Sequence, residues 1–124
     1  MLGVEGEELV ARLRALCLAL PEVTEKTSHG TPSWFVRRMF ASYVGRHHGS
    51  EHLALWVAAP EGAQEEMVEA EPDRFFVPPY VGHRGWLGMR LDAEPGGPDW
   101  DEVRELLTDA YRQVAPKGLA ARLG

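Results

Sequence analysis

The fold is decided by residues 34–44, WFVRRMFASYV, in which two aromatic and β-branched runs flank a pair of arginines. Both runs have the composition of β-strands, and the charged pair between them is enough for a tight turn. We therefore predict a β-hairpin with Arg37 and Arg38 at its tip. Residues 53–57, LALWV, add a third antiparallel strand, because a nearly continuous apolar run indicates burial on both faces.

Helices are predicted on either side of this meander. Residues 5–20 carry apolar side chains at i, i+1, i+4, i+7, i+8 and i+11, the pattern of a one-sided helix, and Pro21 ends it. The same kind of spacing occurs after Asp99, an N-cap residue with Glu102 three positions on, and it runs to residue 114. A short, weakly anchored helix is expected to end near residue 70.

The remaining strands are expected at the margins of the sheet. Residues 23–27 favour a short edge strand, and residues 80–91 favour a second hairpin around a glycine-bounded turn at residues 82–85. Pro78 and Pro79 prevent residues 75–77 from being a regular central strand. The sequence thus predicts an α+β fold over residues 1–124, a single domain with an N-terminal helix, an antiparallel sheet of about five to six strands in two hairpin or meander units, and a C-terminal helix packed on the sheet.

The composition sets the broad class of the protein. With 124 residues, 44% apolar and 26% charged, the chain fits one globular core. The single cysteine, Cys17, lies in the apolar stripe of the first helix and cannot form an internal disulfide. No apolar run approaches the ~20 residues of a membrane span, and the first residues are acidic. We therefore expect a cytoplasmic, cofactor-free monomer without a membrane partner.

The charges are segregated along the chain, although their sum is −6. Residues 60–73 and 92–105 each hold six acids, while the strand-and-turn residues 34–59 and 74–91 hold six bases and one acid. One explanation is that acids favour helix N-termini and solvated helical faces. The other is a sheet-and-hairpin surface with a locally positive potential that can hold an anion or a phosphate backbone.

No catalytic constellation or metal site is predicted. His48 and His52 have a spacing that brings ligands together on a helix, but Gly49 and Ser50 disfavour a helix there. No nucleophile elbow surrounds Ser28 or Ser33. The glycine-bounded turns do not lead from a buried strand into a helix, as a phosphate-cradling loop requires.

Several short motifs follow one another along the chain. They are residues 20–23 (LPEV), 29–36 (HGTPSWFV), 38–41 (RMFA), 72–76 (PDRFF), 78–82 (PPYVG) with 85–86 (GW), and 99–102 (DWDE) leading to Tyr111. Taken in this order they resemble the MmcQ/YjbR family, and the likeness runs from Leu16 to Leu123. The resemblance implies a compact α/β domain with a double-wing arrangement of hairpins, described as DNA-binding-like for its shape, and it carries no settled activity. The family pattern has a lysine where Arg38 stands, so the charge is kept.

Our hypothesis from the sequence is weak, salt-dependent, non-catalytic nucleic-acid (DNA) binding through the hairpin wings, because basic groups beside aromatic ones suit it. Two alternatives stay open. A cleft near loop residues could instead hold a small anionic ligand or a peptide. A protein-interaction adaptor would expose an apolar patch. The candidate residues for nucleic-acid or anion binding are Arg37, Arg38, Arg46, His83, Arg84 and Lys117, and those for the cleft are His29, Trp34 and Tyr80.

Overall fold

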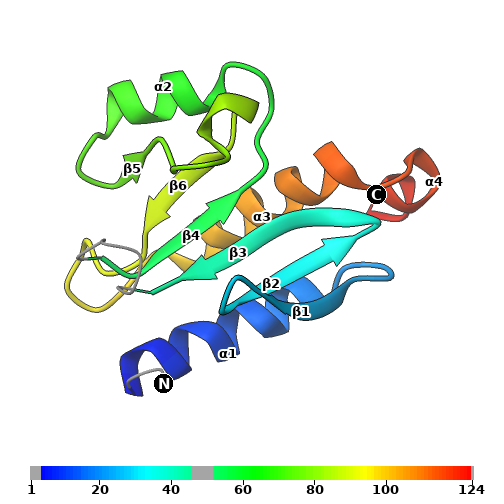
Figure 1. The fold of residues 1–124 in the computed structure, drawn as a ribbon, viewed down its shortest axis with the longest axis horizontal. Helices are drawn as coiled ribbons and strands as arrows, with labels where there is room; N and C mark the ends of the chain where they lie inside the picture. The colour runs from blue at the N-terminus through cyan, green and yellow to red at the C-terminus, as the bar shows by residue number, and fades with distance from the viewer. Residues whose placement is uncertain (1–3, 46–51, 124) are drawn as a thin grey trace.

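A single antiparallel sheet organises the protein, seen in a computed structural model that describes residues 4–45 and 52–123 (Figure 1). The described strands form a six-stranded sheet in the order β1-β2-β3-β4-β6-β5. This confirms the predicted α+β architecture. The elements are α1 (Val4–Leu18), β1 (Thr24–Ser28), β2 (Thr31–Val36), β3 (Arg38–Val44), β4 (Ala54–Val57), α2 (Ala63–Ala70), β5 (Phe75–Phe76), the 3-10 turn η2 (Gly82–Arg84), β6 (Leu87–Arg90), α3 (Trp100–Val114), α4 (Lys117–Ala120) and the 3-10 turn η3 (Ala121–Leu123).

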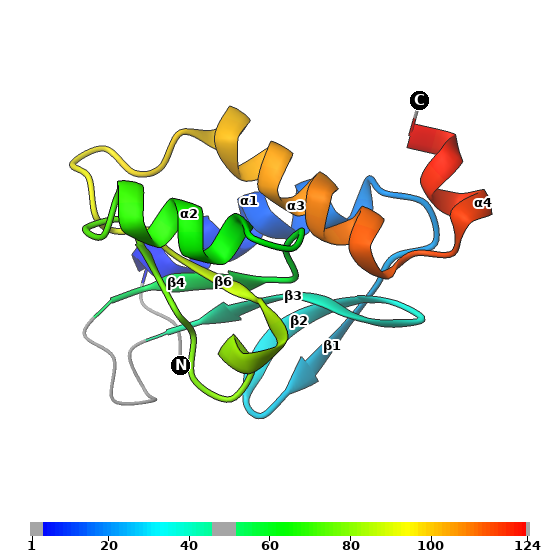
Figure 2. The ribbon, with the colours of Figure 1, turned by 90° about the horizontal axis from the view of Figure 1, so that it is seen from above.

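The helices cover one face of the sheet and leave the other open. Figure 2 shows α1, α2 and α3 on the same side of the strands. The core lies between these layers, where Leu13 of α1, Phe40 of β3 and Tyr111 of α3 are fully buried. Tyr111 meets Phe40 edge to face at 5.8 Å between ring centroids, and its hydroxyl donates to the Pro21 carbonyl at 2.8 Å. No helix in the described ranges is both long and apolar enough to span a bilayer.

A bulge between β2 and β3 decides which side chains reach each face. Trp34 pairs with Ala41 and Phe35 with Met39, so Phe40 is an extra residue on β3. Because of this extra residue, Phe40 and Ala41 are both fully buried in the core, although they are consecutive. The alternation resumes at Ser42, which pairs with Ser33 on the open face.

Two arginine–carboxylate clusters attach the helical layer to the sheet. Arg14 of α1 donates to both oxygens of Glu25 on β1, at 2.7 and 2.9 Å, and the Trp34 indole Nε1 donates to the same carboxylate at 2.8 Å. Arg74, beside β5, binds Glu102 in the first turn of α3 through two bonds of 2.6 and 3.0 Å. Asp99 caps α3 as predicted, while the Glu102 carboxylate bonds Arg74.

The second predicted hairpin is wrong in one strand. Residues 80 and 81 are not extended, and β6 pairs instead with β4 on one side and with Phe75–Phe76 on the other. The physical reason is the turn that follows Pro78 and Pro79. The Val81 N–H donates to the Pro79 carbonyl at 2.7 Å, so it is not available to a neighbouring strand.

Candidate functional site

A cleft of about 540 Å³ lies on the open face of the sheet. Figure 2 shows that the β1–β2 turn and the η2 segment both project from this face, on the side away from the helices. Between them the outward side chains of β2, β3 and β4 form a floor. The residues that line the cleft are Ser28, His29, Thr31, Met39, Ser42, Val44, Trp56, Tyr80, Val81 and Arg84.

One wall is the two-residue turn between β1 and β2. His29 and Gly30 both have positive φ, of 51° and 80°, which identifies the type I′ geometry that suits two-residue hairpins. Glycine adopts this conformation readily, whereas histidine does so at a cost of about 1–2 kcal/mol. The turn places His29, which is exposed to solvent, among the residues that line the cleft.

The opposite wall is a tight turn centred on Tyr80. Its φ of 68° and the hydrogen bond from Val81 N–H to the Pro79 carbonyl describe a γ-turn of the rare, strained kind. The Tyr80 side chain is 80% exposed, so packing does not explain the strain. A strained, exposed aromatic residue at a cavity is the kind of outlier from which a functional hypothesis can start.

Arg84, four residues further on, is the one arginine or lysine among the described residues that line the cleft. Its guanidinium carbon lies 5.5 Å from the centre of the Trp86 ring, so the charged group makes a cation–π contact with the indole. Within the described part of the chain Arg84 makes no ion pair. The charge is therefore available to a ligand.

The wall that carries Tyr80 and Arg84 is fixed to the helical layer by α2. The Gln64 side-chain amide donates to the Gly82 carbonyl at 2.8 Å and to the Trp86 carbonyl at 2.6 Å. The close packing at Gly82 also favours glycine, because a Cβ at this position would lie only 2.5 Å from Val77 Cγ1. The turn is thus held in one position on both sides of Arg84.

The floor combines apolar and hydroxyl groups. Ser42 of β3 and Trp56 of β4 are register partners, and Thr31 and Ser42 are almost completely buried, at 4% and 5% exposure. Their hydroxyl oxygens lie 3.0 Å apart. None of the described lining residues is acidic, although the chain contains 19 aspartates and glutamates.

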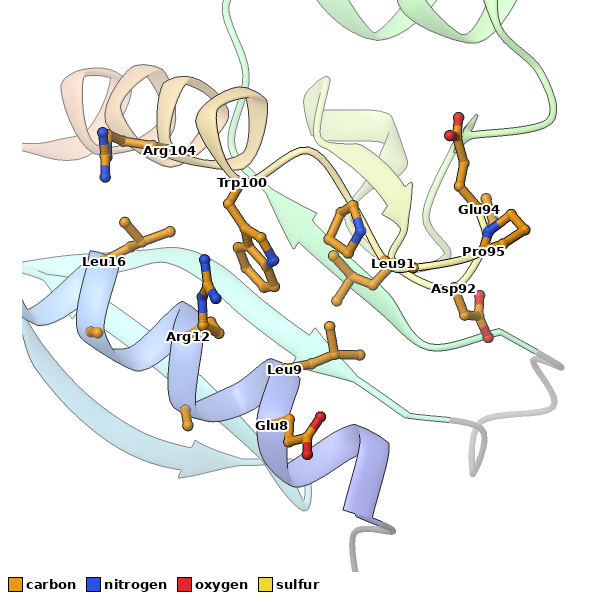
Figure 3. Close-up of a pocket in the computed structure, with 16 residues that line it drawn as sticks. Glu8, Leu9, Arg12, Leu16, Leu91, Asp92, Glu94, Pro95, Trp100 and Arg104 are labelled. Carbon is orange, nitrogen blue, oxygen red and sulfur yellow. The ribbon is translucent and has the colours of Figure 1, made fainter.

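A second hollow, the groove, lies between α1, the loop after β6 and the start of α3 (Figure 3). It is larger, about 1150 Å³, but its charges are mixed, because Glu8, Asp92 and Glu94 line it together with Arg12 and Arg104. Arg12 faces Trp100 across the groove at 4.7 Å from the ring centre. Because three carboxylates line the groove together with its two cations, the groove is a weaker candidate for binding an anion.

The basic residues proposed from the sequence do not all lie at one place in the structure. Arg84 lines the cleft and His83 is its exposed neighbour, whereas Arg37 and Arg38 lie at the other end of β2. Arg37 forms an ion pair of 3.3 Å with Glu22 there. Lys117 begins α4 and is exposed. Arg46 and His48 lie outside the described residues.

The cleft residues proposed from sequence are brought together in part. His29 and Tyr80 both line the cleft, 51 positions apart in the chain. Trp34 does not, because its side chain points to the helix-covered face, where it is 0% exposed and bonded to Glu25. No three His, Cys, Asp or Glu side chains converge as a metal site in residues 4–45 and 52–123.

The hydroxyl residues in the floor of the cleft were not predicted from the sequence. Ser42 lies in an otherwise apolar strand and Thr31 directly follows the His29–Gly30 turn, and both facts were available as signals. Arg84 is among the residues predicted for nucleic-acid or anion binding and not among those predicted for the cleft, although it stands four positions from Tyr80 and therefore in the same loop.

Comparisons with known proteins agree with the fold. A family model described as YjbR matches residues 18–113. The crystal structure of Deinococcus radiodurans protein DR2400, described as a DUF419 domain, is similar with a TM-score of 0.70 at 23% sequence identity, over 93% of this chain and 87% of that chain. At this level of identity the likeness shows the fold alone. No curated protein matches the chain.

Proposed function

This chain belongs to the YjbR family, and we propose that it binds a small anionic molecule in the cleft on the open face of its sheet, without transforming it. The observation that carries the proposal is the lining of the cleft. His29 and Tyr80, from two distant turns, stand over one floor with Arg84, and no described lining residue is acidic. The chain has a net charge of −6, so a cleft that holds an arginine and no described carboxylate is a favourable place for an anion to bind.

The geometry of the two walls supports the same function. Both are short turns that hold a non-glycine side chain at positive φ, and Gln64 fixes the second turn to α2. A preformed site loses less free energy to ordering when a ligand arrives. A volume of about 540 Å³ is in the usual range for small-molecule pockets.

Three of the four tryptophans make a direct test possible. Trp56 lines the cleft, Trp100 lines the groove, and Trp34 is buried on the covered face. We expect phenyl phosphate, titrated to about 1 mM into ¹⁵N-labelled protein, to shift the Trp56 indole resonance and to leave those of Trp34 and Trp100 unchanged. Arg84→Gln should weaken this response, and Arg38→Gln, an exposed arginine at the far end of β2, is the matched control.

The proposal fails if no indole resonance responds, or if Trp100 responds and Trp56 does not. Nucleic-acid binding through the basic turns stays a prediction. The described residues proposed for it lie at separate places in the fold, in the β2–β3 turn, in η2 and at the start of α4. A labelled DNA duplex at low salt, with Arg38→Glu as the variant, would test it in the same experiment series. An adaptor role likewise stays a prediction, and the large apolar residues exposed in the described ranges are Leu18, Val77 and Tyr80.

A further inference from the structure

Three hydroxyl side chains are linked on the open face of the sheet. Thr31 Oγ1 lies 2.9 Å from the Ser28 carbonyl oxygen and 3.0 Å from Ser42 Oγ. Ser33 Oγ lies 2.9 Å from Ser42 Oγ and 3.3 Å from the Thr31 carbonyl oxygen. Thr31 and Ser42 line the cleft, and Ser33 does not.

The protons of these hydroxyls are all used within the protein. Three hydroxyls supply three protons to four contacts, so no O–H is left for a ligand. The three shortest contacts are satisfied together when Ser33 donates to Ser42, Ser42 donates to Thr31, and Thr31 donates to the Ser28 carbonyl. Each cleft hydroxyl then keeps one lone pair. This part of the floor therefore accepts hydrogen bonds and offers none.

The rest of the cleft has the opposite chemistry. Trp56 is the register partner of Ser42, so an indole surface adjoins the hydroxyls on the side toward β6. Arg84, which only donates hydrogen bonds, stands on the wall beyond it. From the hydroxyls of β2 and β3 to the η2 segment the floor and far wall thus change from acceptor, through apolar, to cationic donor, while His29 and Tyr80 line the two turns at the rims.

From this order we infer the class of ligand: a flat, largely apolar molecule that carries an acidic group at one end and an N–H or O–H donor at the other. The acidic group binds Arg84, the body covers Trp56, and the donor binds Thr31 and Ser42. This inference rests on the proposed function, because it specifies the occupant of the same cleft.

Matched aryl phosphates test the inference on the unmodified protein. The probes are phenyl phosphate, the three isomeric aminophenyl phosphates, which add donors, and the three nitrophenyl phosphates, which add only acceptors. We expect the best amino isomer to bind about threefold to tenfold tighter than phenyl phosphate, the gain of one hydrogen bond, and every nitro isomer to bind no tighter than phenyl phosphate.

Variants of the floor show where the preference originates. In the double variant Thr31→Val with Ser42→Ala the preference for the best amino probe over phenyl phosphate, measured as the ratio of their affinities, should fall to about one. Ser33→Ala is the matched control, since it removes a hydroxyl of the same network from outside the cleft and should keep the preference. Each single variant, Thr31→Val and Ser42→Ala, is measured as well, in case the double variant does not fold.

The outcomes separate the two proposals. If all seven phosphates bind with equal affinity and Arg84→Gln weakens them alike, the inference is overturned and the proposed function stands. If nitro probes bind best, the floor donates and the inference is also wrong. If none binds, the proposed function itself fails.

Discussion

The two faces of the sheet use the same residue types for opposite purposes. On the covered face an arginine, a glutamate and a tryptophan, Arg14, Glu25 and Trp34, bind one another through three short hydrogen bonds. On the open face Trp56, Arg84 and two hydroxyls line a cleft without a described carboxylate. In the first arrangement the polar groups bond one another and stabilise the fold. In the second they can bond a ligand.

This difference is expressed in charge as well as in packing. The Arg14 hydrogen bonds hold the pKa of Glu25 below its ordinary value, and the Trp34 indole adds to the effect. Arg74 is neutralised in the same way by Glu102 and Glu71, which raise the pKa of its guanidinium. Arg84 has no such partner in the described residues. Changes on the covered face should therefore alter folding, and changes on the open face should alter binding.

The largest expected effect compares two tryptophans. Trp34→Leu should lower the free energy of unfolding by about 3 kcal/mol, because a fully buried indole is removed and its hydrogen bond to Glu25 is lost. Trp56→Leu should cost only about 1 kcal/mol, since that ring is partly exposed in the cleft. Urea unfolding measures both, and equal losses would contradict the division between the faces.

The next effect compares two exposed arginines. Arg84→Gln should weaken phenyl phosphate binding by about tenfold, the loss of one charged hydrogen bond, with little change in stability. Arg38→Gln should leave the affinity unchanged, because Arg38 is not among the residues that line the cleft. Isothermal titration calorimetry measures both. A similar loss in the two variants would mean that the whole molecule's potential, and not the cleft, attracts the anion.

A smaller effect is a pH dependence confined to the covered face. Glu25 has a lowered pKa in the folded protein, so its ionised form stabilises the fold above the ordinary glutamate value of about 4.3, and this stability is lost as the pH falls through the lowered value. Glu25→Gln should thus cost about 1 kcal/mol at pH 7 and almost nothing at about pH 2–3. Glu69→Gln, on the exposed surface of α2, is the control and should show no such trend.

The smallest effect concerns the first wall of the cleft. His29→Asn should weaken phenyl phosphate binding by about twofold to threefold, because it removes the ring but keeps the turn. Asparagine tolerates positive φ well, so the melting temperature should hardly change. If the affinity stays constant in this variant, the β1–β2 turn takes no part in binding and the site is restricted to Arg84 and its neighbours.

Local patterns in the sequence were enough for most of the architecture. The spacing of apolar residues after Asp99 predicts α3, and the arginine pair between two strand-like runs predicts the β2–β3 turn. Predictions failed where one hydrogen bond or one extra residue overrides the pattern. Residues 80–81 look extended, but the Val81 N–H bonds the Pro79 carbonyl.

The site was predictable in its rims and not in its floor. His29 and Tyr80 stand out because one precedes a glycine and the other follows two prolines, and the structure brings both to one cleft. Trp34 was misassigned because nothing in its own strand says which face is covered. That depends on the contacts of α1 with β1 and on the extra residue Phe40, which come from distant parts of the chain.

A crystal structure of the protein with phenyl phosphate would show whether the cleft on the open face is the anion-binding site. We expect phosphate density within hydrogen-bonding distance of the Arg84 guanidinium, with the phenyl ring over Trp56. Density at Arg12 and Arg104 in the groove, or at Arg37 and Arg38 at the far end of β2, would contradict it.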